Sequence, residues 1–78
     1  MLRLNPASPQ AHYHLGGLYF INGLYDKAIK EYQRATELDN EFKEAYHFMG
    51  LAFDILGQVR EAEQAFQRAR HSKRKALL

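Results

Sequence analysis

The chain has 78 residues, of which 46% are hydrophobic and 26% are charged, and a formal net charge of +2. This length and composition are typical of a single small globular domain and exclude a largely disordered chain. Residues 1–10 contain both prolines and no long apolar run, so no secretory signal or membrane span is expected there. The absence of cysteine excludes a disulfide framework and a cysteine nucleophile.

The first helix is predicted to follow Ser8, because serine is a favoured N-cap and Pro9 suits the first helical position, where no N–H is needed. It should end near Asn22, since Gly23 can adopt the left-handed conformation that terminates many helices. Its core face follows the i, i+3, i+4, i+7 spacing of one helix side. That face consists of His12, Leu15, Gly16 and Tyr19.

Three further helices are predicted, and no segment has a strong strand pattern. The second covers residues 26–39, the third begins after Asn40 and stops at Leu56 and Gly57, and the fourth begins near Val59 or Arg60. Their inward residues are, in order, Ala28, Tyr32, Ala35 and Leu38; Ala45, Tyr46, Met49, Gly50 and Phe53; and Ala62, Phe66 and Ala69.

The chain repeats itself at an offset of 34 residues. When residues 9–42 are paired with residues 43–76, eight positions are identical, whereas average residue usage would give roughly two by chance. A fixed period of this size indicates stacked supersecondary units. The identities fall at Ala11, Gly16, Ile21, Gly23, Ala28, Gln33, Arg34 and Ala35.

Each unit is predicted to be a helical hairpin, because short connections force neighbouring helices to lie antiparallel. Small residues are expected where the two helices cross, and large aromatic residues should fill the space on either side. The expected small pairs are Gly16 with Ala28 and Gly50 with Ala62, and the aromatic pairs are Tyr19 with Tyr32 and Phe53 with Phe66.

Two copies of one motif carry a resemblance to a known family. The units read His12-x2-Leu15-Gly16-x2-Tyr19 with Ala28-x3-Tyr32, and Tyr46-x2-Met49-Gly50-x2-Phe53 with Ala62-x3-Phe66. They resemble the tetratricopeptide repeat (TPR), whose pattern is W-x2-L-G-x2-Y, then A-x3-F, then P over 34 residues. The resemblance implies an all-α fold, an α-solenoid of two antiparallel helical hairpins in a right-handed superhelix. A related family of short helical repeats of similar design remains the alternative.

The two ends of the chain depart from the family pattern. Leu4, Asn5 and Pro6 align one period upstream of Leu38, Asp39 and Asn40, and Ser72 and Arg74 replace the leucine and proline that the pattern predicts. We therefore expect that repeats precede this chain and that the array terminates near Arg74. The predicted organisation is the end of a preceding repeat and a linker over 1–8, repeats over 9–42 and 43–72, and a basic tail or helix continuation over 73–78.

A partner-binding groove is predicted on the first and third helices. The resemblance implies that the first helices of successive repeats line a concave wall, and helical geometry selects residues that point about 80 to 140° away from the core face. Apolar side chains there indicate a second partner surface, although Phe20 and the aliphatic members could instead pack between repeats. The predicted groove consists of Gln10, Tyr13, Gly17, Phe20, Ile21, Glu44, His47, Leu51, Asp54 and Ile55.

The chemistry of this face predicts the kind of partner. Some members of the family bind acidic chaperone tails through a clamp of lysine, asparagine and arginine, but the corresponding places here hold Tyr13, Gly17, Phe48 and Glu44. None of these can neutralise a carboxylate, so a chaperone tail is not expected. An extended or helical protein segment with apolar or aromatic side chains is the expected partner.

No catalytic or cofactor site is predicted. The chain has no phosphate-binding glycine loop, and its serines lie at a predicted helix cap and near the C-terminus. A helix places His12 and His14 about 200° apart, so they cannot share a metal ion. The sequence therefore predicts a non-catalytic interaction module without metal or cofactor.

Two alternative functions remain open. Apolar repeat ends could let copies of the chain stack or exchange helices, which would make it a structural building block. Residues 68–78 hold five basic side chains and no acidic ones, which could attract nucleic acid or an anionic surface. The favourable position of cations at a helix C-terminus explains part of that basic run without a nucleic acid.

Overall fold

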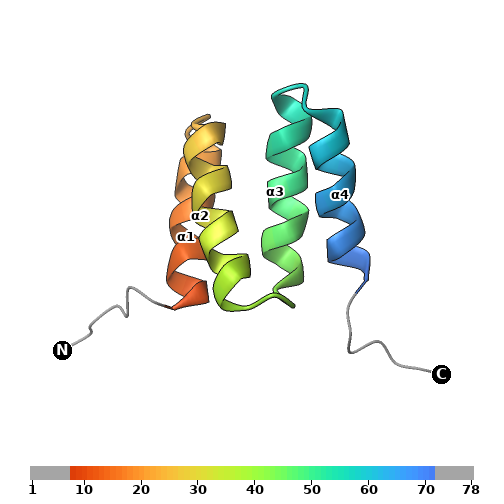
Figure 1. Ribbon diagram of the computed structural model, residues 1–78. Coiled ribbons are helices and arrows are strands. Elements are labelled where there is room, and N and C mark those ends of the chain that lie inside the picture. The colour runs from red at the N-terminus through yellow and green to blue at the C-terminus, as the bar shows by residue number, and fades with distance from the viewer. Residues whose placement is uncertain (1–7, 72–78) are drawn as a thin grey trace.

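A computed structural model describes residues 8–71, which form four helices and no strand. They are α1 (Pro9–Ile21), α2 (Tyr25–Leu38), α3 (Lys43–Ile55) and α4 (Val59–Arg70). Helices α1 and α2 form one antiparallel hairpin and α3 and α4 a second, and α2 packs against α3 to join them (Figure 1). The predicted all-α architecture of two hairpins is therefore confirmed.

The helix ends follow from local sequence, as predicted. The Ser8 hydroxyl accepts a hydrogen bond from the Ala11 amide at 3.3 Å, and Pro9 occupies the first turn. At the end of α1, Gly23 has φ 78° and the Leu24 amide donates to the Tyr19 carbonyl at 2.9 Å. Gly57, with φ 83°, ends α3 in the same way. These are Schellman caps, which favour glycine because a side chain is strained at positive φ.

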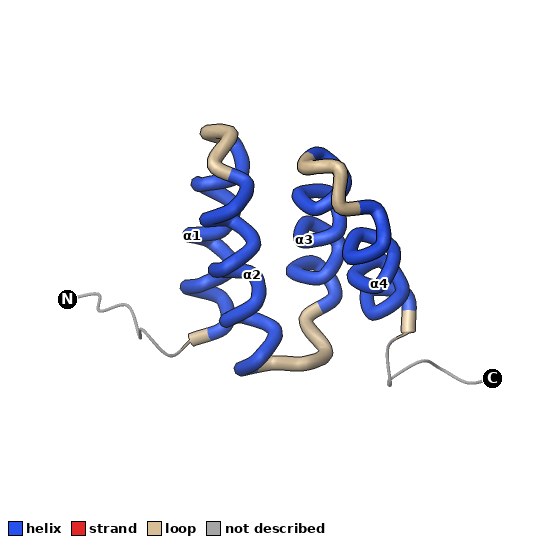
Figure 2. The backbone as a smooth tube through the Cα atoms, turned by 45° about the horizontal axis from the view of Figure 1, so that its top comes forward, coloured by secondary structure: helices blue, strands red, loops and turns tan. Residues whose placement is uncertain are grey.

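The predicted start of the third helix after Asn40 is wrong by two residues. An Asp39 carboxylate oxygen accepts a hydrogen bond from the Glu41 amide at 3.0 Å, and the Asp39 carbonyl accepts one from the Phe42 amide at 3.1 Å. This Asx turn competes with helix formation, so α3 begins at Lys43. Figure 2 shows this loop at the end of the molecule opposite to the two hairpin turns.

Within each hairpin, a glycine of the first helix receives an aromatic ring of the second. A Cβ atom at Gly16 would lie 2.7 Å from Cε1 of Tyr32, and one at Gly50 would lie 2.7 Å from Cε1 of Phe66. The pairing of Gly16 with Ala28 and of Gly50 with Ala62 stays a prediction, but the atoms nearest to each added Cβ belong to the aromatic ring. A flat ring fits closely against bare backbone, so the small and large residues meet each other directly.

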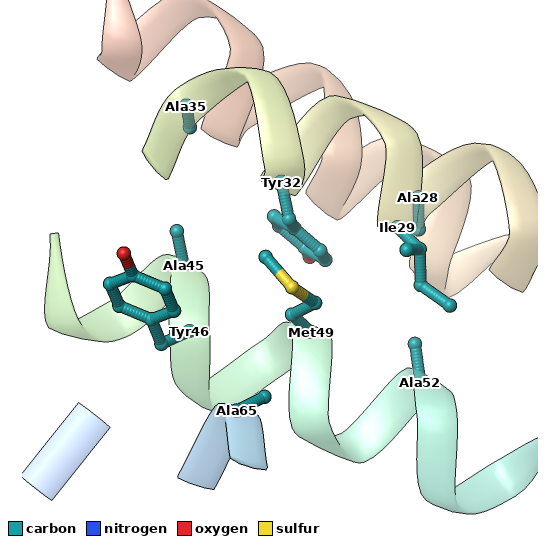
Figure 3. Close-up of a cluster of buried hydrophobic side chains, with 9 residues drawn as sticks. All are labelled: Ala28, Ile29, Tyr32, Ala35, Ala45, Tyr46, Met49, Ala52 and Ala65. Atoms are coloured by element: carbon teal, nitrogen blue, oxygen red, sulfur yellow. The ribbon is translucent and has the colours of Figure 1, made fainter. Parts of the chain in front are cut away.

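The main core lies between the two hairpins (Figure 3). It contains six of the residues predicted to face inward and adds Ile29, Ala52 and Ala65, which the single-stripe prediction omitted. Leu15 and Leu38, predicted inward, are 38% and 48% exposed because no other described element covers their sides of the helices. The buried residues of the cluster are Ala28, Ile29, Tyr32, Ala35, Ala45, Tyr46, Met49, Ala52 and Ala65.

The predictions for residues 1–7 and 72–78 lie outside the described residues. They concern the tail of a preceding repeat at Leu4 to Pro6, the end of the array at Ser72 and Arg74, and the basic residues Lys73 to Lys75.

Candidate functional site

Two apolar hollows open on α1 and α3. The first, here called the α1 hollow, has a volume of about 240 Å³ and is lined by Tyr13, His14, Gly17, Leu18, Phe20, Ile21, Tyr32 and Phe48. The second, the α4 hollow, has a volume of about 470 Å³ and lies between α3 and α4. It is lined by Lys43, Glu44, His47, Phe48, Phe66, Ala69 and Arg70.

Phe48 separates the two hollows and contributes to both. Its ring centroid lies 5.8 Å from that of Phe20 in an edge-to-face arrangement and 6.3 Å from that of Tyr32 in a stacked one. On its other side it meets His47 edge to face at 5.4 Å. Ring contacts of this geometry contribute more free energy than the burial of their apolar area alone. They hold the Phe48 ring in place as the wall that α3 contributes to the α1 hollow.

Tyr13 forms a second wall of the α1 hollow and also joins the hairpins. Its ring centroid lies 4.8 Å from that of Phe42 in the inter-hairpin loop and 5.9 Å from that of Tyr32. Burial, and to a lesser extent the negative charge of Glu44, raise the pKa of the Tyr13 hydroxyl. Tyr13 therefore presents a neutral hydroxyl at neutral pH.

Tyr32 contributes a hydroxyl to the same hollow. Its side chain is 1% exposed, and burial, followed by the nearby Tyr13, raises its pKa to about 12. No polar side-chain atom of the described residues is buried without a hydrogen-bond partner. Tyr32 lines the α1 hollow. A Cβ atom at Gly17 would lie 4.0 Å from this hydroxyl. Gly17 therefore contributes no side chain between this hydroxyl and the α1 hollow.

The structure distributes the predicted groove residues over three places. Tyr13, Gly17, Phe20 and Ile21 line the α1 hollow, and Glu44 and His47 line the α4 hollow. Gln10, Leu51, Asp54 and Ile55 line neither of these two hollows, and all but the half-buried Leu51 are exposed. Phe20 has a packing role as well, because its ring meets Tyr25 edge to face at 5.3 Å.

Sequence reasoning missed three aromatic residues that shape the hollows. The repeat pattern predicts Tyr32 and Phe66 only as hairpin-core residues, whereas each also forms part of a hollow. The family resemblance gives Phe48 only a place in the carboxylate clamp. Its equivalent one period earlier is His14, so an aromatic residue there is not explained by the repeat pattern. Most paired positions differ between the two repeats, so the sequence holds no signal that identifies Phe48 as a site residue.

The cationic Arg68 is engaged within the protein. Its guanidinium lies 5.1 Å from the ring centroid of Tyr46, and its Nη2 atom donates to the Tyr46 hydroxyl at 3.1 Å. These contacts hold the positive charge against an aromatic face. Arg68 is therefore less available to an anionic partner than its place in the basic run suggested.

Neither a metal centre nor a membrane helix is found in the described part of the chain. Between residues 8 and 71, no three or more histidine, aspartate or glutamate side chains cluster as metal ligands would. Within the same range, no helix combines the length and the hydropathy needed to cross a bilayer.

Comparison with known proteins gives three similarities. A family model described as "TPR repeat" matches residues 16–57. The "Small glutamine-rich tetratricopeptide repeat-containing protein 2" of Mycosarcoma maydis is 31% identical over 67 residues, which cover 86% of this chain and 19% of that protein. The crystal structure of MamA superposes with a TM-score of 0.81 at 32% identity, over 85% of this chain and 39% of that one. This chain thus corresponds to a minor part of either relative.

Proposed function

The chain belongs to the tetratricopeptide repeat family, and on this premise we propose that it is a non-catalytic module that docks a segment of a partner protein on the face formed by α1 and α3. Repeats of this family generally mediate protein–protein interaction. The observation that carries the proposal is the α1 hollow, an apolar hollow lined by the rings of Tyr13, Phe20 and Phe48 together with Tyr32.

The walls of the α1 hollow favour an apolar or aromatic side chain of the partner. The rings of Tyr13, Phe20 and Phe48 are held by contacts with one another and with the core, so they keep their places when the hollow is empty. A preformed apolar cavity of this kind binds a hydrophobic group with little reorganisation. None of its lining residues is a lysine or an arginine, so a carboxylate is a poor occupant.

The Tyr32 hydroxyl adds a polar requirement. Because its pKa is raised to about 12, the hydroxyl is neutral at physiological pH and can donate one hydrogen bond and accept others. A partner side chain with a polar group beyond an apolar body, such as tyrosine or tryptophan, would satisfy both the rings and the hydroxyl. The proposed ligand is therefore an extended or helical segment with one such anchor residue.

A Gly17→Leu substitution tests this function with little risk to the fold. The place of the Gly17 side chain is open apart from the Tyr32 hydroxyl, leucine is a good helix former, and the second repeat carries Leu51 at the equivalent position. The leucine should fill the α1 hollow. Gln67→Leu, which adds the same side chain to the exposed surface of α4, is the matched control.

The readout is binding by the immobilised chain. Proteins recovered from an extract of the parent cells should be held by the wild type and the Gln67→Leu control, and lost or reduced at least about tenfold with Gly17→Leu, which corresponds to one anchor contact of about 1.4 kcal/mol. Circular dichroism must show that all three chains are equally helical. Undiminished recovery by a folded Gly17→Leu chain would refute docking in the α1 hollow.

A further inference from the structure

A third hollow, here called the Glu61 hollow, is lined by residues of α2, α3 and α4 and has a volume of about 250 Å³. It shares no lining residue with the α1 hollow or the α4 hollow. Tyr46, Met49 and Ala65, which line it, belong to the main core (Figure 3). The packed core therefore holds the floor of this hollow in place, while its lining residues Glu61 and Gln64 are exposed.

The internal repeat shows a cation over the ring that corresponds to Phe53, another lining residue of the Glu61 hollow. In the first hairpin, Nζ of Lys27 lies 5.9 Å from the centroid of the Tyr19 ring, a distance at which a cation is attracted to an aromatic face. One 34-residue period later the same two positions hold Glu61 and Phe53. The second hairpin therefore keeps the aromatic ring but replaces its cation with a carboxylate.

No cation of the described residues pairs with this carboxylate. Glu61 forms no ion pair within residues 8–71. Arg68 lines the same hollow, but it is held by the ring and the hydroxyl of Tyr46 and lies two helical turns, about 10.5 Å, along α4 from Glu61. A carboxylate and an aromatic ring thus line one hollow without a cation between them, which makes the hollow complementary to a positively charged side chain.

We propose that the Glu61 hollow binds an arginine side chain of a partner protein, whose guanidinium lies over the Phe53 ring and pairs with the Glu61 carboxylate. Arginine suits the hollow better than lysine, because its planar guanidinium stacks on an aromatic ring and donates two parallel hydrogen bonds to a carboxylate. Gln33 and Gln64 line the same hollow, and their amide oxygens can accept the remaining N–H groups. Met49 offers apolar surface to the methylene stem of the arginine.

The basic residues of a second copy of this chain suit the hollow less well. The run of five basic residues over 68–78 starts at the hollow itself, because Arg68 lines it. Two copies joined there would bring two such runs together, and like charges placed against each other oppose association. A partner that offers a single arginine avoids this repulsion.

Titration of the 78-residue chain with the tripeptide acetyl-Gly-Arg-Gly-amide, followed by NMR, tests the proposal. Millimolar peptide should shift the signals of Phe53, Glu61 and Gln64. The matched peptide with citrulline, whose urea group has the shape of guanidinium without its charge, should bind at least about tenfold more weakly. A peptide with lysine in place of arginine should also bind more weakly than the arginine peptide.

Two substitutions at Glu61 locate the binding. Glu61→Lys copies Lys27 and supplies a cation to Phe53 from within the chain, so it should weaken binding of the arginine peptide at least about tenfold. Glu61→Gln, which removes only the charge, should weaken it too. Glu63→Lys makes the same charge change at an exposed position of α4 that lines none of the three hollows. This matched control should bind as the wild type does, and circular dichroism must show that all variants are equally helical.

Unchanged binding by a folded Glu61→Lys chain would overturn the proposal, as would equal binding of the arginine and citrulline peptides or no binding of the arginine peptide by the wild type. A lysine peptide that binds as tightly as the arginine peptide would refute the choice of arginine. Concentration-dependent self-association that Glu61→Lys abolishes in sedimentation would assign the hollow to a second copy instead. The Glu61 hollow and the α1 hollow share no residue, so these outcomes are separate from docking in the α1 hollow.

Discussion

The neighbouring glycines 16 and 17 should respond in opposite ways to the same substitution. Gly16→Ala places a Cβ atom 2.7 Å and 2.9 Å from Cε1 and Cδ1 of Tyr32, whereas carbon atoms in contact normally lie about 3.5 to 4.0 Å apart. The ring has little room to withdraw, because it is 1% exposed and lies against the rings of Tyr13 and Phe48. Gly17→Ala meets only the Tyr32 hydroxyl, at 4.0 Å.

The magnitudes follow from two opposing effects. Replacing a helical glycine by alanine stabilises a helix by about 0.5 to 1 kcal/mol, and overpacking a core costs about 1 to 3 kcal/mol. Gly17→Ala should therefore gain about 0.5 to 1 kcal/mol. Gly16→Ala should lose about 1 to 2 kcal/mol, because the crowding outweighs the helix propensity.

Urea and thermal unfolding followed by circular dichroism measure both changes. In a chain of this size each kcal/mol moves the thermal midpoint by about 4 to 8 °C, so the two variants should differ by about 6 to 24 °C. The wild type is the common reference, since both variants have the same composition. A Gly16→Ala chain as stable as Gly17→Ala would show that the close approach of Tyr32 does not limit the core.

Three further predictions concern other contacts. The Tyr32 hydroxyl, whose pKa is raised from 10.0 to about 12, favours the fold in its neutral form; its contribution is full below about pH 10 and is lost as pH rises to about 12. Urea midpoints should fall across that range, and less steeply in Tyr32→Phe; equal slopes would contradict this. Gly23→Ala should lose about 1 kcal/mol in urea unfolding, because φ there is 78° and no neighbouring atom lies within 4 Å to add crowding. His12 Nδ1 and Glu31 Oε1 lie 2.8 Å apart, so Glu31→Ala should lower the free energy of unfolding by about 0.5 to 1 kcal/mol. Adding His12→Tyr, which copies the residues of the second repeat, should restore that stability. Strictly additive losses in the double variant would argue against an interaction between His12 and Glu31.

The helices and their termini could be predicted because their signals are local. Ser8, Pro9, Gly23 and Gly57 act on the backbone within a few residues, and each has the predicted role in the structure. The start of α3 could not be predicted, because the outcome depended on whether the Asp39 side chain would cap a turn or leave the backbone free for a helix.

The partners of the large side chains were harder to predict than the helices. Motif spacing placed Gly16 and Tyr32 in one hairpin core, but not in direct contact. The position of Phe48 between two hollows depends on how the second hairpin is rotated relative to the first, which no short-range pattern encodes. The exposure of Leu15 depends likewise on whether a neighbouring hairpin covers it.

The buried surface between α2 and α3 consists largely of alanine, at positions 28, 35, 45 and 52. Alanine has no side-chain rotamers to lose on burial, so these residues bring α2 and α3 together without an entropic cost from their side chains. Among the buried residues of the cluster, Ile29, Tyr32, Tyr46 and Met49 have rotatable side chains that lose freedom on burial. The orientation of one hairpin relative to the next is therefore set by a few larger side chains among the interface alanines. Exchanging one of these larger side chains should change the angle between hairpins more than the stability of their contact.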